Sequence, residues 1–317
     1  MSLFVWMDIV DNILLGDKRS IARSISIIDD NDPKSYEILK KIYNKTGGTI
    51  TIGFTGPGGA GKSTLIGKLI PYFKSLGYKI AILAVDPTSP ITGGAILGDR
   101  VRMQSTMDDE EVFMRSFGSR GTMGGISKSL RNAIRILDAA GFTLILVESV
   151  GAGQLEVEIS KVVNLTTVVF NPNTGDSIQA VKAGLTEIGD IYIVNKSDME
   201  GSGTLYLSLL DLIGETPRKP LIVKTSTKTG EGLQELCLNI NSMIKNDEWV
   251  LKQKQKQKQI LRDELKEMVL EKGKQKTLEL FKSRSQEING LLDSMLNKIK
   301  DPYTVAEELS LLIFSNK

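Results

Sequence analysis

The chain has 317 residues, enough for about two domains at roughly 150 residues each, and its 41% hydrophobic content is typical of a globular protein. Its 40 basic and 38 acidic side chains leave a net charge of +2, so bulk charge does not favour binding to nucleic acid or to a membrane. The absence of histidine and the single cysteine exclude imidazole bases, histidine metal ligands and an intramolecular disulfide, so we expect any metal to have oxygen ligands.

The N-terminal segment has the apolar spacing of helices. Ile9 and Ile13 are four residues apart, and Ile21, Ile25 and Ile28 follow at the same kind of interval. We therefore predict an N-terminal helical extension over residues 1–46.

Targeting and membrane segments are not evident in the sequence. The apolar stretch 3–7 is interrupted by Asp8 and Asp11, and no basic leader or small-residue cleavage site accompanies it. The longest apolar run, around 143–147, is far shorter than the ~18 residues of a membrane span. We expect a cytoplasmic protein that binds neither membrane nor nucleic acid.

Residues 47–245 alternate short β-type runs with helical stretches. The apolar runs are 49–54, 80–85, 143–147, 167–170, 191–194 and 221–223. Strands that alternate with helices predict a mostly parallel central sheet covered by helices on both faces, which is an α/β fold.

Residues 246–317 form a second module with helical spacing, for example at Ile288, Leu292 and Ile299. Lysine alternates with glutamine over 252–259 without interleaved aromatic residues, which favours a solvated helix start or linker over nucleic-acid contact. The apolar faces of the tail must be buried somewhere. They either fold back on the same chain or pair with a second chain.

A glycine-rich segment after the first predicted strand fits the phosphate-loop pattern G-x-x-x-x-G-K-[S/T] and opens a helix. Its glycines let successive backbone N–H groups and the helix N-terminus face phosphate groups. Lys62 is expected to reach the β and γ phosphates, and Ser63 to offer a hydroxyl to Mg²⁺. The residues predicted to bind the nucleotide here are Gly56, Pro57, Gly58, Gly59, Ala60, Gly61, Lys62, Ser63 and Thr64.

A second motif predicts which base is bound. Asn195-Lys196-Ser197-Asp198 follows the apolar run 191–194, at the carboxyl edge where open α/β sheets bind ligands. The Asp198 carboxylate can accept both N1–H and the exocyclic amine of guanine, whereas adenine lacks this pair of donors. Lys196 would lie over the base and Asn195 would support the loop, while a backbone N–H in the segment that contains Ser226 and Thr227 would contact the guanine oxygen.

Acidic residues end two other predicted strands. Asp86 follows the run 80–85 and Glu148 follows the run 143–147. Each is either a solvent-exposed strand end or an organiser of Mg²⁺ and water. Asp99 lies beside a glycine-rich loop, where it is either an ordinary loop acid or part of the nucleotide site.

Several longer strings make the chain similar to the MeaB/MMAA/ArgK family, the P-loop GTPases associated with cobalamin-dependent methylmalonyl-CoA mutase. These strings are 16–19 with 22–23, the phosphate loop, 84–90, 93–100, 119–125, 148–154, 195–198 and 301–303. The resemblance covers most of the chain. It implies a P-loop NTPase fold with the helical prefix and the C-terminal helical module added to it.

The resemblance also implies roles. It places Asp86, Asp99 and Glu148 at magnesium or switch positions, so that the predicted metal ligands are Ser63, Asp86, Asp99 and Glu148 and the predicted catalytic residues are Lys62, Asp99 and Glu148. It implies GTP and GDP with Mg²⁺ as ligands, and a metallochaperone-type protein that gates cobalamin loading and protects the mutase. The family's C-terminal helices make a homodimer, which favours pairing of the tails.

The sequence departs from the family at three places. Thr143 stands where an acid is usual, residues 179–182 read Gln-Ala-Val-Lys within the family's third switch at 171–182, and Thr227 replaces an alanine.

Two other functions compete with the mutase chaperone. A nickel-inserting maturation GTPase would need histidine or cysteine clusters, and an ATP-dependent kinase or transport ATPase is disfavoured by Asp198.

Overall fold

The computed structural model describes residues 3–30, 32–87, 111–119, 125–149, 154–172, 186–214 and 220–314. Asp99 lies outside these ranges. So do residues 173–182 of the predicted third switch, which include Gln179 and Lys182. Asp86 belongs to a described strand, but its side chain is not described.

Seven parallel strands form one sheet in the order β3-β2-β4-β1-β5-β6-β7. The strands are β1 (Ile50–Thr55), β2 (Ile80–Pro87), β3 (Phe113–Ser119), β4 (Leu144–Ser149), β5 (Leu165–Phe170), β6 (Ile191–Val194) and β7 (Leu221–Lys224). The predicted parallel α/β fold is confirmed. Strand β3 was not predicted, because this edge strand carries polar residues such as Arg115 and Ser116 in place of an unbroken apolar run.

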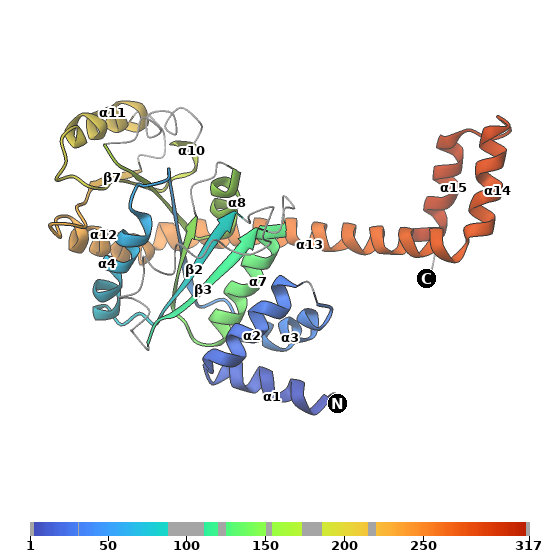
Figure 1. The fold of residues 1–317 in the computed structure, drawn as a ribbon, viewed down its shortest axis with the longest axis horizontal. Coiled ribbons are helices and arrows are strands. Elements are labelled where there is room, and N and C mark those ends of the chain that lie inside the picture. Colours follow the sequence, from blue (N-terminus) through green and yellow to red (C-terminus); the bar gives the residue numbers. More distant parts are fainter. Residues whose placement is uncertain are drawn as a thin grey trace. The chain divides into compact units, whose positions relative to one another are not determined.

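Helices cover both faces of the sheet. The helices are α4 (Lys62–Ser75), α7 (Gly125–Ala139), α8 (Gln154–Val162), α10 (Thr186–Ile188), α11 (Ser202–Gly214) and α12 (Leu233–Ile244). Alternate residues of a strand point to opposite faces, so in β4 Ile145 and Val147 pack with α7 and α8, while Leu144 and Leu146 pack with α4 and α12. Figure 1 shows α4 and α12 on one side of the sheet and α7 on the other.

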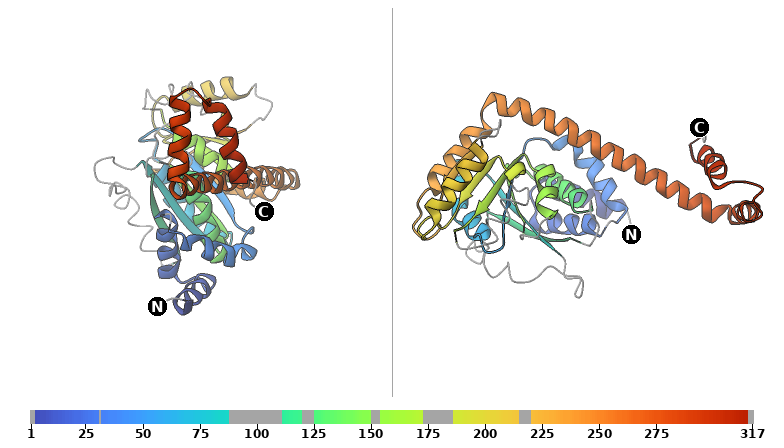
Figure 2. Two further views of the ribbon diagram at one scale, coloured as in Figure 1. Left: turned by 90° about the vertical axis from the view of Figure 1, so that its right-hand side faces the viewer. Right: turned by 90° about the horizontal axis from the view of Figure 1, so that it is seen from above.

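The N-terminal segment is helical, with α1 (Leu3–Leu14), α2 (Lys18–Asp29), α3 (Lys34–Ile42) and a short 3-10 turn (Tyr43–Lys45). Ile13, Ile21, Ile25 and Ile42 are fully buried in the core that also contains α7 and the adjoining face of the sheet. Figure 2 shows these helices beside α7 from two further directions. The segment therefore packs as part of the sheet's own compact unit, which spans Met1–Val250.

A second compact unit spans Leu251–Lys317 and contains most of α13 (Asp247–Ser283), with α14 (Ser285–Leu296) and α15 (Pro302–Phe314). Among its described residues only Glu264, Ile288 and Val305 are buried. The lysine and glutamine repeat lies in α13, and most of its side chains are exposed.

The described helices include none that is long and apolar enough to cross a membrane. The division at residues 46 and 245 stays a prediction.

Candidate nucleotide-binding site

Those predicted site residues that the structure describes lie at the carboxyl edge of the sheet, because all the strands run in the same direction. The phosphate loop follows β1, Glu148 lies near the end of β4, and the segment 195–198 follows β6. Glu148 pairs in register with Phe54, two residues before the loop begins. The parallel topology thus brings three segments that are distant in sequence to one place.

The backbone of the phosphate loop requires glycine at two positions. Gly56 has φ of 134°, and a Cβ there would lie 2.1 Å from the carbonyl oxygen of Val169. Gly61 has φ of 88°, and a Cβ there would lie 2.6 Å from Nδ2 of Asn195. Any larger residue would displace the loop from the neighbouring strands. Gly61 is also the N-cap of α4, so the positive end of that helix dipole opens at the loop.

Lys62 is held at the loop by its own backbone. Its side chain is almost fully buried, and its ammonium group donates to the carbonyl oxygens of Gly56 at 2.8 Å and Pro57 at 3.0 Å. These contacts keep a positive charge beside the turn whose N–H groups are expected to face phosphate. Thr64 lies exposed in the first turn of α4, and its role stays a prediction.

Ser63 and Glu148, both predicted metal ligands, lie in contact with each other. The Ser63 hydroxyl donates to Oε1 of Glu148 at 2.5 Å, and the Glu148 residue is only 2% exposed. The prediction that these two residues serve one site is consistent with this contact. The roles of Asp86 and Asp99 stay predictions, because neither side chain is described.

Two side chains that directly follow β6 hold carbonyl groups of the loop. Asn195 donates from Nδ2 to the carbonyl oxygen of Ala60 at 2.9 Å, and Lys196 donates from Nζ to that of Gly59 at 3.0 Å. Lys196 has φ of 57°, a left-handed conformation that is uncommon outside glycine and that accompanies its reach to the loop. The base-recognition segment is therefore hydrogen-bonded to the phosphate loop.

Asn171 is a site residue that sequence reasoning did not connect to the loop. It directly follows β5, and its Nδ2 donates to the carbonyl oxygen of Gly59 at 2.7 Å. Its place at the carboxyl end of a predicted strand was the signal available in the sequence.

The base-recognition residues contact one another. The Ser226 hydroxyl donates to Oδ1 of Asp198 at 2.5 Å, and the Thr225 hydroxyl donates to Oδ1 of Asn195 at 3.2 Å. The hydrogen bond from Ser226 is the main reason that the pKa of Asp198 lies below its usual value, with smaller contributions from Lys228 and Lys196. Asp198 is therefore ionised at neutral pH and accepts hydrogen bonds only.

The guanine-contact segment differs from expectation in one detail. The backbone N–H of Ser226 donates to the carbonyl of Glu231 at 3.0 Å, so Ser226 acts on the site through its hydroxyl. The expected backbone contact to the guanine oxygen is therefore assigned to Thr227, as a prediction.

Two further residues bear on the sequence predictions. Glu156, in the first turn of α8, is buried, and this burial raises the pKa of its carboxyl, while the positive charge of Lys62 partly offsets the effect. Sequence reasoning missed it, because its pattern is that of an ordinary helix acid.

Thr143, where the family usually has an acid, accepts a hydrogen bond from the backbone N–H of Lys79 at 2.9 Å and so joins the beginnings of two strands.

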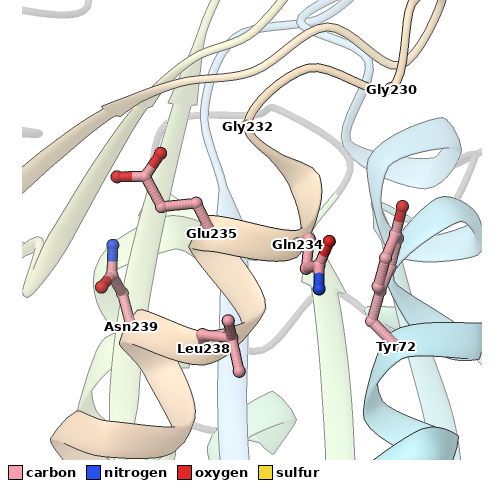
Figure 3. Close-up of a pocket in the computed structure, with 7 residues that line it drawn as sticks. All are labelled: Tyr72, Gly230, Gly232, Gln234, Glu235, Leu238 and Asn239. Atoms are coloured by element: carbon pink, nitrogen blue, oxygen red, sulfur yellow. The ribbon is translucent and has the colours of Figure 1, made fainter.

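A pocket of about 490 Å³ lies between α4 and α12. Its lining residues are Tyr72, Gly230, Gly232, Gln234, Glu235, Leu238 and Asn239 (Figure 3). None of the residues predicted to bind the nucleotide lines this pocket, so it is separate from the candidate site.

Known proteins resemble the chain in sequence and in fold. Residues 21–280 match the family described as methylmalonyl-CoA mutase-associated GTPase MeaB. A protein of Pyrococcus horikoshii that is named as a GTPase is 41% identical over 95% of this chain and 96% of its own length. The mitochondrial methylmalonic aciduria type A homolog of Mus musculus is 28% identical over 71% of this chain and 59% of its own length.

A solved structure agrees at the level of the fold. The crystal structure of a LAO/AO transport system kinase has a TM-score of 0.68 and 22% identity, and the match covers 99% of both chains. Together with the phosphate loop at the end of β1, this likeness confirms the predicted P-loop NTPase fold. The sequence match over residues 21–280 shows that the chain belongs to the MeaB family of methylmalonyl-CoA mutase-associated GTPases.

Proposed function

We propose that the chain binds GTP and GDP with Mg²⁺ at the carboxyl edge of the sheet, and that it uses GTP hydrolysis to gate cobalamin loading of a methylmalonyl-CoA mutase. The observation that carries the nucleotide assignment is the connected set of Asp198, Ser226, Asn195 and Lys196. Asn195 and Lys196 are hydrogen-bonded to the phosphate loop, and Asp198, which accepts from Ser226, lies in the same short segment with a carboxylate that suits guanine.

Base selection follows from the protonation state of Asp198. A carboxylate offers two acceptors and no donor, which matches N1–H and the exocyclic amine of guanine. Adenine presents an acceptor at N1, so it would face the same carboxylate with a repulsive contact. The lowered pKa of Asp198 keeps this preference intact throughout the neutral range.

The phosphate half supplies charge and position. Phosphoryl transfer depends mainly on positioning and on neutralisation of charge. Lys62, together with the N-terminus of α4, would stabilise the β and γ phosphates.

The donor set also fits Mg²⁺, which prefers oxygen ligands and commonly uses one or two carboxylates together with phosphate oxygens. Ser63 and Glu148 would hold it, with Asp86 and Asp99 as further candidates. When bound there, Mg²⁺ would supply positive charge that offsets the charge of the phosphates.

The Asp198→Asn variant tests the base assignment. Loss of a charge-assisted partner costs roughly 1.5–3 kcal/mol, so GTP affinity should fall by about 10- to 150-fold, while xanthosine triphosphate should gain. Calorimetry with GTP, ATP and xanthosine triphosphate measures this, and Asp211→Asn on the exposed side of α11 is the matched control. Equal wild-type affinities for ATP and GTP would overturn the guanine assignment.

The mutase as partner is supported by the family description and by the name of the mouse relative. Affinity purification of the full chain from its source cell, in parallel with GTP and with GDP, should recover a cobalamin-dependent mutase. Recovery of a different metalloenzyme, with no mutase in either sample, would argue for another maturation role.

We also propose that the tail makes a homodimer. Its described residues expose many large apolar side chains, including those of Leu265, Leu296, Ile299, Tyr303 and Leu311. Pairing with a second copy would bury them, and two-fold dimers are the commonest assemblies.

A further inference from the structure

A phosphate loop depends on donors behind it. When its N–H groups face a ligand, its carbonyl groups turn towards the protein, where each needs a hydrogen-bond donor to stay in place. Here the carbonyl oxygen of Ala60 receives one donor from Asn195, but the carbonyl oxygen of Gly59 receives two. Gly59 thus receives two side-chain donors that come from outside the loop.

The two donors to Gly59 come from different strands. Asn171, after β5, donates at 2.7 Å, and Lys196, after β6, donates at 3.0 Å. The backbone N–H of Asn195 also donates to the carbonyl of Phe170 at 2.8 Å, so the ends of β5 and β6 are tied together at this point. Lys196, from the segment predicted to bind the base, and Asn171 therefore donate to the same carbonyl oxygen of the phosphate loop.

Asn171 and Lys196 differ in how firmly they hold that oxygen. Asn171 is 1% exposed and has a short side chain, so it loses little freedom when it makes the contact. Lys196 is partly exposed and reaches Gly59 with a long side chain from a left-handed residue. The buried asparagine is the more rigid of the two supports.

We propose that Asn171 is a positioning residue of the nucleotide site, and that it and Lys196 jointly hold the Gly59 carbonyl so that the phosphate and base halves bind a guanine nucleotide as one unit. The proposal rests on the proposed function of the same site. It places Asn171 behind the loop, without contact to the nucleotide. Loss of Asn171 should therefore weaken GDP and GTP by similar factors and leave the preference for guanine over adenine unchanged.

A double-mutant cycle tests this proposal with the full chain and GDP. Either donor alone still holds the carbonyl, whereas loss of both leaves it without these supports. The Asn171→Ala and Lys196→Met pair should therefore lose more affinity than the product of the two single losses, by about threefold or more. The control pair, Asn171→Ala with Ser63→Ala, shares no acceptor and should multiply within about twofold. A smaller excess for the Asn171 and Lys196 pair would overturn the proposal.

A second variant separates positioning from folding. Asn171→Asp keeps the size of the side chain but turns the donor into an acceptor that faces a carbonyl, so its affinity loss should at least equal that of Asn171→Ala. Thermal unfolding without nucleotide gives the stability of each variant, and calorimetric stoichiometry gives its folded fraction. A lowered Tm with unchanged GDP affinity of the folded protein would show a merely structural role and overturn the proposal.

The outcome also distinguishes this proposal from the guanine assignment. If the wild type prefers ADP, the guanine assignment fails, and the same cycle is then measured with ADP. If the wild type prefers GDP and the two losses simply multiply, the guanine assignment stands and the role of Asn171 fails.

Discussion

The two compact units of the chain bury their apolar residues to very different extents. In the unit Met1–Val250, strands such as β4 are buried on both faces, and the core continues into the N-terminal helices. In the unit Leu251–Lys317, Ile288 and Val305 are the buried apolar residues among those described.

This difference shows that helix formation and core formation are separate properties of a sequence. The described part of the tail forms three helices, but few of their apolar side chains are buried within the unit. Burial rather than helix propensity supplies most helical stability in proteins. The first unit is stabilised by the burial of its own apolar core. The second unit needs another surface, which we propose is a second copy of the chain.

The largest effect is expected at Lys62. Replacement by alanine removes the positive charge at the phosphate loop, and charge-assisted hydrogen bonds contribute roughly 1.5–3 kcal/mol each. Lys62→Ala should therefore weaken GTP and GDP by about two orders of magnitude or more, measured by calorimetry. Because the tail is a separate unit, light scattering should show an unchanged assembly state, and a change there would contradict the independence of the two units.

The next effect concerns the tail. Leu296 and Ile299 are 80% and 75% exposed in the single chain. Burial of such a side chain contributes roughly 1.5–3 kcal/mol, so Leu296→Asp with Ile299→Asp should weaken dimerisation at least tenfold to a hundredfold. Light scattering should show the 34.8 kDa monomer for the double variant and twice that mass for the wild type.

The matched control for the tail is Leu207→Asp. Leu207 is 64% exposed on α11 of the first unit, so it tests whether any exposed leucine has the same effect. The control should remain dimeric. A monomeric wild type at tens of micromolar, or dissociation caused by Leu207→Asp alone, would contradict pairing through the tail.

A smaller effect is expected at Asp138, which joins α7 to the entrance of β1. Its carboxylate accepts hydrogen bonds from the backbone N–H groups of Gly47, Gly48 and Thr49. Asp138→Ala should reduce the free energy of unfolding of the first unit by roughly 1–3 kcal/mol, because it removes acceptors from three donors. Urea unfolding measures this, and Asp211→Asn should leave the free energy unchanged.

The smallest expected effect concerns how the stability of the first unit depends on pH. Burial raises the pKa of Glu156, so its ionisation costs stability as the pH rises from acid values through that raised pKa. Glu156→Gln should therefore gain stability relative to the wild type from about pH 4 to pH 7.

Glu158→Gln is the control of opposite sign. Although burial opposes it, hydrogen bonds from Ser127 and Lys161 hold the pKa of Glu158 below its usual value. The wild type should therefore gain stability over Glu158→Gln as the pH rises at acid values, up to the ordinary glutamate pKa of 4.5 and not beyond it, measured by urea unfolding. If the free energy of unfolding of both variants, relative to the wild type, changed with pH in the same way, the described difference between the surroundings of Glu156 and Glu158 would be wrong.

Local patterns predicted much of the site. The phosphate loop and the segment 195–198 are short strings whose residue types fit one chemistry, and each stands directly after an apolar strand. Contacts between distant segments were harder to predict. Asn171 and Glu156 are ordinary residues in sequence, and only their neighbours in space connect them to Gly59 and Lys62.

The sequence by itself predicted every strand except β3, and it predicted which loop suits phosphate and which carboxylate suits guanine, because these depend on residue type and spacing along a few turns of chain. The tertiary structure alone decided that β3 closes one edge of the sheet, that the N-terminal helices join the core, and that Asn171 and Lys196 meet at one oxygen. The physical reason is that these features depend on the order of parallel strands, which brings together residues more than a hundred positions apart and has no signature in local spacing.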